Sequence, residues 1–159
     1  MSRYASGTNV SVERSQQEVK ELLRRYGASK FGLMEDDDQA AVMFVASGLT
    51  VRIVVPLPSI EDEEIALTDA GRERSPSATR TAYEKEVRRR WRALILAIKA
   101  KLEAVESGIS TIEQEFMPFV VMPDGRSFAD HALPQIRRAV ESGQMPMLGL
   151  PEPKGADHA

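Results

Sequence analysis

Apolar side chains recur along the chain at two different spacings, and the change of spacing separates helices from strands. From residue 15 the apolar positions step by three and four residues, the spacing of one helix face. Ser15 and Glu18 form a capping box at the start of this stretch, and Gly27 supplies the left-handed residue that ends a helix. The pattern predicts a helix over residues 15–26. Its apolar positions are Val19, Leu22, Leu23 and Tyr26.

Three strands are predicted next. Phe31 and Leu33 alternate with small or polar neighbours, and the run 41–45 is apolar on both faces, as in a central strand. Residues 49–55 alternate again and end at a Pro-Leu-Pro segment. Because the turns between these runs are short, we expect an antiparallel meander.

The longest predicted helix spans residues 78–106 and ends at Ser107-Gly108. Its apolar stripe is long enough to cover the sheet. The stripe consists of Tyr83, Val87, Trp91, Leu94, Ile98, Leu102 and Val105. At 100° per residue, five cations fall on roughly the opposite side. They are Lys85, Arg88, Arg89, Arg92 and Lys99.

Shorter elements are expected in the C-terminal third. A capping box at 110–113 opens a short helix, 119–122 is extended, and a start signal at 127–130 opens a helix that reaches residue 142. Pro134 kinks or restarts that helix. The fold class is α+β: an α-β-β-β-α core with a three-stranded antiparallel sheet on a long helix, plus C-terminal helices. We expect one domain over residues 1–144.

Three segments are expected to be loosely held. Residues 1–10 show no period and read as a loose arm. The charged stretch 59–78, which contains Gly and Pro, reads as a mobile surface loop. The proline-rich tail 145–159 reads as disordered.

Composition narrows the setting. The 159 residues contain no cysteine, which excludes disulfides, thiolate metal sites and thiol nucleophiles. No apolar run reaches the roughly 18–20 residues that a transmembrane helix needs, and the polar N-terminus lacks a secretion signal. We therefore expect no membrane partner and a cytoplasmic location. The net charge of −3 is segregated: nine acids and one base lie in 35–69, but eight bases and three acids in 80–103.

The basic side of the long helix is the main candidate site. Lys85, Arg88, Arg89, Arg92 and Lys99 offer phosphate contacts to DNA or RNA, with a salt-dependent affinity. The alternative is an ordinary solvated helix face, because exposed helix positions are commonly Lys or Arg. Trp91 lies on the apolar side and is expected in the core.

Other chemistry finds little support in the sequence. Ser127 is better explained as a helix cap than as a nucleophile, and His131 directly follows Asp130 on a helix and so points away from it. The acidic runs 35–38 and 61–64 lack the spacing of a calcium loop. We assign no catalytic, cofactor or metal residue, we see no small-molecule substrate, and we do not expect an enzyme.

The predicted order of elements is shared by several nucleic-acid proteins. Metal-dependent nucleases of the restriction-enzyme type place acids in the second and third strands, and the runs 41–45 and 51–55 contain none. The order also resembles double-stranded-RNA-binding domains and Rad52-like annealing proteins. No motif in this chain carries either resemblance, which stays at the level of topology.

A more specific resemblance spans most of the chain. The segments that carry it are VERS (12–15), LRRYGA (23–28), VPLP (55–58), RWRAL (90–94), IKAKLEAVESG (98–108) and MPDGR (122–126). In these segments the chain resembles an uncharacterised family encoded by phages and prophages. The resemblance implies a mobile-element context and no activity.

Two function classes follow. The first is a non-enzymatic nucleic-acid-binding or accessory protein of phage DNA metabolism that uses the basic helix side. The alternative is an assembly factor that binds a copy of itself or a host protein. It would use the long helix, with Ile95 and Leu96 at the interface, or the segment 145–150.

Overall fold

The computed structural model describes residues 9–145, and it has the predicted α+β architecture. Helix α1 (Val12–Arg25) leads into a meander of strands β1 (Ser29–Glu35), β2 (Gln39–Ala46) and β3 (Leu49–Pro56). The short α2 (Glu63–Ala66) precedes the long α3 (Pro76–Glu106). The chain continues through α4 (Ile112–Phe116) and the 3₁₀ helix η1 (Met117–Phe119) to α5 (Phe128–Ser142). The tail segment expected to be disordered lies outside the described residues from 146 onward, as do residues 1–8 of the expected arm.

The sheet is antiparallel with strand order β1-β2-β3, as predicted. Val42 pairs with Ile53 and Phe44 with Val51, and these residues face the helices. The register shifts between Ser29 and Gly32, which places a bulge at the start of the edge strand β1. The β2–β3 turn is two residues long, with both Ser47 and Gly48 at positive φ, the conformation that a tight hairpin requires.

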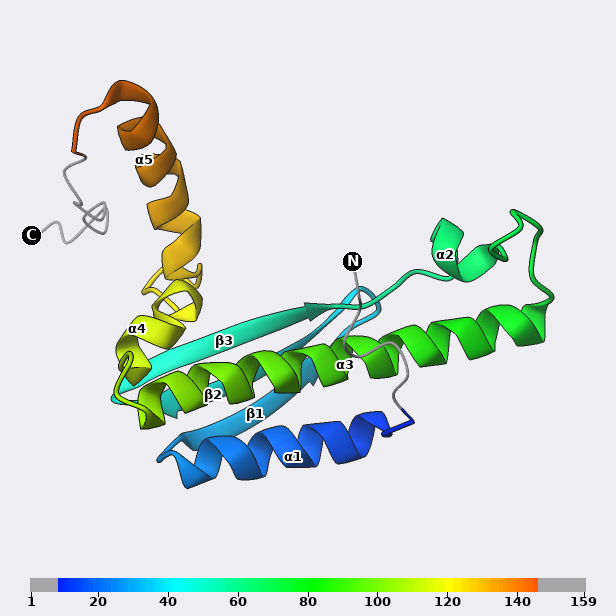
Figure 1. Cartoon of the computed structure of the whole chain (residues 1–159), viewed down its shortest axis with the longest axis horizontal. Helices are drawn as coiled ribbons and strands as arrows, with labels where there is room; N and C mark the ends of the chain where they lie inside the picture. The colour runs from blue at the N-terminus through cyan, green and yellow to red at the C-terminus, as the bar shows by residue number, and fades with distance from the viewer. Residues whose placement is uncertain (1–8, 146–159) are drawn as a thin grey trace, which may run out of the picture.

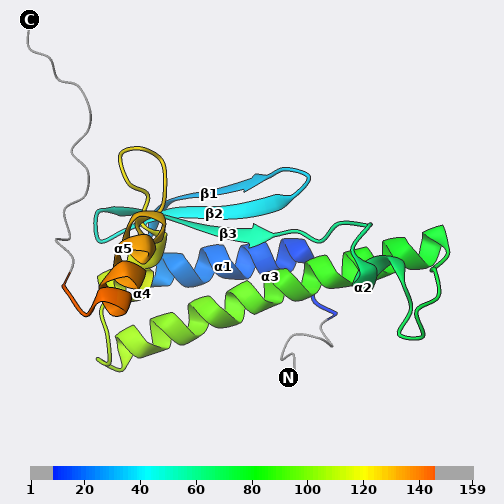
Figure 2. The ribbon, with the colours of Figure 1, turned by 90° about the horizontal axis from the view of Figure 1, so that it is seen from above.

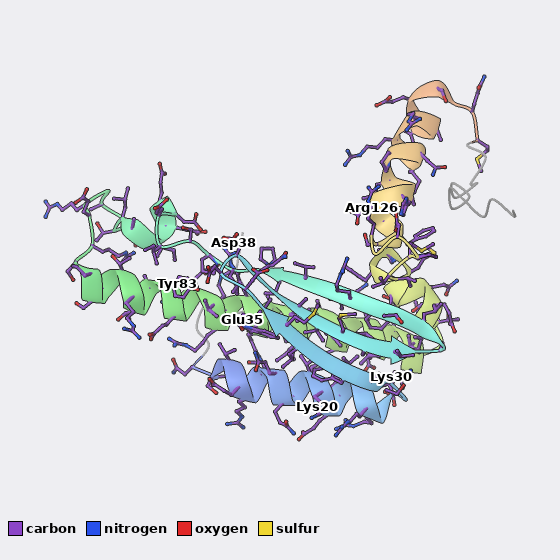
Figure 3. The ribbon with its side chains drawn as sticks, turned by 180° about the vertical axis from the view of Figure 1, so that it is seen from behind. Lys20, Lys30, Glu35, Asp38, Tyr83 and Arg126 are labelled. Carbon is purple, nitrogen blue, oxygen red and sulfur yellow. The ribbon has the colours of Figure 1, made fainter. Side chains whose placement is uncertain are left out.

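Helices α1 and α3 lie side by side on one face of the sheet, and Figure 2 shows the two layers edge-on. The core between the layers contains Trp91, Ile98 and Leu102 from α3 together with Val19 and Leu23 from α1. The opposite face of the sheet, which we call the outer face, has no helix over it in Figure 3. The N-terminal part of α3 extends beyond the end of the sheet, with α2 folded back near it (Figure 1).

Two helix caps are formed by other residues than the sequence analysis predicts. Ser11, not Ser15, caps α1 by accepting from the backbone N–H of Arg14. The helix therefore begins one turn earlier than predicted, and Ser15 is a fully buried helical residue. The α4 capping box is formed by Thr111 and Gln114, one residue later than expected. The start signal predicted at Ser127 is confirmed: Ser127 and Asp130 form a capping box that opens α5, and the helix continues through Pro134.

The stretch 59–78 has more structure than the sequence predicts. Ile65 on α2 is buried, Leu67 forms an isolated bridge with Glu73, and Arg74 Nε donates to the Leu67 carbonyl at 2.9 Å. Helix α3 begins within this stretch, where Ser75 accepts from the backbone N–H of Ala78. The apolar anchors and the early helix start together fix a path for the segment.

The turn between η1 and α5 is fastened to strand β3. Val120 bridges Val51, Val121 bridges Ser127, and Arg52 donates to the Gly125 carbonyl at 2.7 Å. The segment 119–122, which the sequence predicts to be extended, makes this contact with the edge of the sheet. As a result, the base of α5 is held at the β3 edge of the sheet, while the helix itself points away from the body (Figure 1).

Candidate functional site

The five candidate cations share one side of α3, but their neighbours divide them into separate groups. Within an ideal helix, Lys85, Arg88, Arg89, Arg92 and Lys99 fall inside an arc of about 100°. The sequence could not show what packs against that arc. In the fold, α1 packs along α3, and the chain from α2 onward folds back beside the N-terminal half of α3 (Figure 1).

Arg92 and Lys99 lie at the seam between α1 and α3. Arg92 Nη1 donates to Glu18 Oε2 at 2.8 Å, and Lys99 Nζ donates to Glu18 Oε1. The hydrogen bond from Lys99, followed by that from Arg92, holds the pKa of the Glu18 carboxyl below its ordinary value. These two cations therefore tie two helices together. A phosphate would have to compete with Glu18 for both of them.

Arg89 is held by a second carboxylate, that of Glu86, which is 8% exposed. Arg89 Nε donates to Glu86 Oε2 at 2.7 Å, and Arg90 Nε donates to Oε1 at 2.9 Å. Burial opposes ionisation of Glu86, but the two arginine hydrogen bonds outweigh it and its pKa lies below the ordinary value. Arg90 also donates to the Pro56 carbonyl at 2.7 Å, so this cluster joins α3 to the end of β3.

A groove of about 810 Å³ lies between the α2 segment and the N-terminal half of α3. Lys85 and Arg89 are on its wall. Three acids and three bases line it, so the charged side chains sum to zero and give a polyanion no net attraction. These six residues are Glu64, Asp69, Arg74, Lys85, Glu86 and Arg89.

Lys85 and Arg88 are what remains of the predicted cationic side. Neither forms an ion pair with a carboxylate in the described part of the chain. Lys85 is exposed, whereas Arg88 is half-buried. Two cations one helical turn apart form a much smaller site for phosphate than the five that the sequence suggested.

Ser127 and His131 do not contact each other in the way a hydrolase would require. Ser127 Oγ accepts from the backbone N–H of Asp130 and donates to Asp130 Oδ2 at 2.7 Å, which completes the helix cap. His131 Nε2 instead lies 2.8 Å from Asp124 Oδ2. The pKa of Asp124 is lowered by the backbone N–H of Arg126 and by His131. These contacts fasten the turn before α5 to the helix.

The acidic runs shape turns. Asp36 Oδ1 accepts from the backbone N–H groups of Asp38 and Gln39, at 3.0 and 2.8 Å, and these bonds lower the pKa of Asp36. Asp62 accepts from the N–H of Ser59 at 2.9 Å. Between residues 9 and 145, no three carboxylate or histidine groups are arranged so that they could hold a metal ion. Within the same range, none of the helices is both long and apolar enough to pass through a bilayer.

Helix α5 carries the most prominent exposed apolar row. Ala129, Leu133, Ile136 and Val140 follow one another at spacings of four, three and four residues, and we call this row the α5 seam. Leu133 is 48% exposed, Ile136 46% and Val140 78%. The neighbouring side of α5 packs on η1, where Ala132 is buried. Helix α5 thus has an apolar face that the other residues of the described range 9–145 leave open.

The outer face of the sheet is a second apolar surface. Met34, Ala41 and Val54 form one row across the three strands, and Met34 and Val54 are about half exposed. A hollow of about 350 Å³ lies over this row, with Glu35, Asp36, Gln39 and Arg52 at its rim. Figure 3 looks onto this face, with Glu35 and Asp38 at the β1–β2 end.

Comparisons with known proteins identify no relative of this chain. No family model, no curated protein and no solved structure matches the chain. The resemblance to a phage-encoded family therefore stays a prediction from the segments that carry it. The functional argument rests on the geometry of the chain itself.

Sequence reasoning misplaced one candidate and missed others. Ile95, predicted as an interface residue, is fully buried where α1 meets α3, whereas Leu96 is 38% exposed as expected of a surface position. The part played by Glu86 was visible in its spacing of three and four residues from Arg89 and Arg90. The α5 seam was visible too, because a 4-3-4 spacing is the pattern of a helix-pairing face.

Proposed function

We propose that this protein is an interaction or assembly module whose partner surface is the α5 seam. One observation carries the proposal: a 15-residue helix projects from the body with Leu133, Ile136 and Val140 facing water. An isolated helix of this length is only marginally stable in water, and helices gain most of their stability by packing an apolar face. A partner on the seam would supply that packing.

The charge pattern supports this function over nucleic-acid binding. Of the five cations predicted for phosphate contact, Arg89, Arg92 and Lys99 have carboxylate partners within the fold. Exposed ion pairs are weak, but Arg92 and Lys99 join α3 to α1 through Glu18, and Arg89 pairs with Glu86, which is largely buried. Release of these cations would therefore cost stability. Within residues 9–145, the exposed side chains of the seam can meet a partner without loss of an ion pair.

The test compares the wild-type chain with a variant in which Leu133, Ile136 and Val140 are all serine. Sedimentation velocity would report self-association, and affinity capture from the native host would report other partners. We expect the triple variant to lose assembly or its captured partner while keeping its helical circular-dichroism signal. Ile109→Ser, which removes one apolar side chain that is 79% exposed elsewhere, is the control and should change neither result.

The proposal fails if wild type and triple variant sediment identically and capture the same proteins. Loss of partners in the Ile109→Ser control would also count against it, because the effect would then come from surface hydrophobicity in general.

A second candidate function is nucleic-acid contact in phage or other mobile-element DNA metabolism. It is supported by Lys85 and Arg88, the two α3 cations without an ion-pair partner in the described chain. The informative variant is Lys85→Glu with Arg88→Glu, since changes at Arg89 or Arg92 would also break contacts to Glu86 or Glu18. A matched charge reversal of Arg14 and Lys20 on α1 is the control.

Fluorescent single- and double-stranded oligonucleotides would be titrated at about 50 mM salt, with a second titration at higher salt. Binding that weakens with salt and is lost in the α3 double variant alone supports this candidate. Absence of binding at low salt, or equal loss in both double variants, contradicts it.

A further inference from the structure

This inference rests on the proposed function and names the partner of the α5 seam as a second copy of the same chain. We propose that the chain forms a symmetric dimer in which the α5 seams of two copies pack antiparallel. The seam has the heptad spacing of helix pairs, with Ala129 and Ile136 at one core position and Leu133 and Val140 at the other. Closed dimers with two-fold symmetry are also the commonest assembly of identical chains.

In the antiparallel pair, the two large central side chains of the seam face each other, and the two end positions of the seam face each other. Reversal of one helix about the middle of the seam places Leu133 opposite Ile136 of the second copy. It places Ala129, the smallest seam residue, opposite Val140 of the second copy, and the symmetry repeats both pairs. A parallel pair would instead place Ala129 opposite Ala129 at the base of the seam and leave a gap there.

The charges beside the seam also favour the antiparallel direction. Asp130 and Arg137 flank the seam on the same side, seven residues apart. In the antiparallel pair, each Asp130 lies within about 3 Å along the axis of Arg137 of the second copy, so two opposite-charge pairs form. Asp130 is available as an anion, because hydrogen bonds from Ser127 hold its pKa below the ordinary value. In a parallel pair this flank of each helix faces the opposite flank of the other, so Asp130 and Arg137 of the two copies would not meet and neither pair would form.

The shape of the molecule leaves room for this arrangement. Helix α5 is fixed to the body near its N-terminal end, through η1 and the turn that precedes it, and its C-terminal end points away (Figure 1). An antiparallel pair therefore places the two bodies at opposite ends of a two-helix bridge. The neighbouring side of α5, where Ala132 is buried, stays packed on its own body.

Association should be reversible. A single pair of 15-residue helices buries less surface than the roughly 1,200 Å² of a stable interface, so we expect a monomer–dimer equilibrium that shifts with concentration. Sedimentation equilibrium up to about 0.5 mM protein would show it. Ile136→Glu should weaken the dimer at least about tenfold, because it buries a carboxylate in the seam.

Cysteine cross-linking tests the direction, and the cysteine-free chain makes single-cysteine variants unambiguous. Ala129→Cys and Val140→Cys lie about 16 Å apart along one helix, whereas a disulfide needs Cα atoms within about 7 Å. Under oxidation, a mixture of the two variants should cross-link readily, and each variant alone should not. Both substitutions are at seam positions outside the buried core, and helical circular dichroism would check that each variant folds.

Three results would overturn the inference. A chain that stays monomeric up to the highest concentration would do so. Cross-linking of Ala129→Cys with itself would show a parallel pair. A dimer that survives Ile136→Glu but is lost on Val54→Glu would place the interface on the outer face of the sheet. The proposed function survives each of these results if the triple serine variant still loses a captured partner, and it fails separately if that variant loses nothing.

Discussion

Helices α1 and α5 have nearly the same length and the same kind of apolar face, yet only one of them is covered. Val19, Leu22 and Leu23 of α1 are buried against the sheet and α3. The corresponding residues of α5, Leu133 and Ile136, are almost half exposed. The difference shows that apolar residues at helical spacing indicate a helix face that is stabilised by packing. The spacing does not indicate whether the surface that packs on this face belongs to the same chain.

The largest expected effect is a difference in the free energy of unfolding between variants of α1 and variants of α5. Leu23→Ala on α1 should lower the free energy of unfolding by about 3 kcal/mol, because it opens a cavity in the core. Ile136→Ala on α5 should change it by no more than about 0.5 kcal/mol at low protein concentration, where the seam is open to water. Denaturant unfolding of both variants measures this contrast. Equal losses would mean that α5 is packed in the monomer.

A smaller effect concerns the polar contacts that hold α1 in place. Glu18→Gln leaves Arg92 and Lys99 without their carboxylate and should cost about 1 kcal/mol, since the site is partly exposed. Glu141→Gln on α5 is the matched control, because Glu141 has no ion pair within residues 9–145. We expect its unfolding curve to overlay that of the wild type. If Glu18→Gln unfolds at the same free energy as the wild type, the contact between α1 and α3 is held by apolar packing alone.

Ser15→Ala should make the protein more stable. Ser15 is fully buried within α1, and its hydroxyl has no hydrogen-bond partner among residues 9–145. Alanine removes this unsatisfied group and is the better helix former, so we expect a gain of about 0.5–1 kcal/mol in thermal or denaturant unfolding. Ser142→Ala, at the exposed end of α5, should be close to neutral. A loss of stability in Ser15→Ala would indicate that the hydroxyl is satisfied by a group not seen in the fold.

The smallest expected effect is the pH dependence of the α1–α3 seam. The pKa of Glu18 is lower in the folded chain than its ordinary value, so its ion pairs stabilise the fold above the ordinary pKa. That contribution is lost as the pH falls through the lowered folded-state value. The stability difference between wild type and Glu18→Gln should therefore shrink on going from neutral pH to about pH 3, as unfolding curves at several pH values would show. A difference that stays constant would contradict the assignment.

Much of the fold could be predicted because local patterns and tertiary packing agree. The strand alternation, the stripe on α3 and the capping box at Ser127 all appear in the structure as the sequence indicates. The error at Ser15 arose because a second serine, Ser11, lies one turn earlier and serves as the cap. Nothing in the pattern around Ser15 distinguishes a cap from a buried serine.

The candidate site was harder to predict, because charge partners are set by packing. Helical spacing correctly placed Lys85 to Lys99 on one side of α3. Only the fold shows that Glu18, more than 70 residues away in the chain, meets Arg92 and Lys99. The burial of Ile95 has the same origin: α1 widens the covered arc of α3 beyond what a sheet alone would cover.

Because α5 is attached at one end, a small rotation at its base moves its far end by a larger distance. Its base is held at the β3 edge through Val120, Val121 and Arg52, while its far end points away from the body formed by residues 9–119. A helix of 15 residues is about 22 Å long, so a tilt of about 10° at the base displaces the tip by about 4 Å. Small shifts in the β3 edge would thereby be enlarged at the tip, and the distance between two joined bodies would depend on the angle at that attachment.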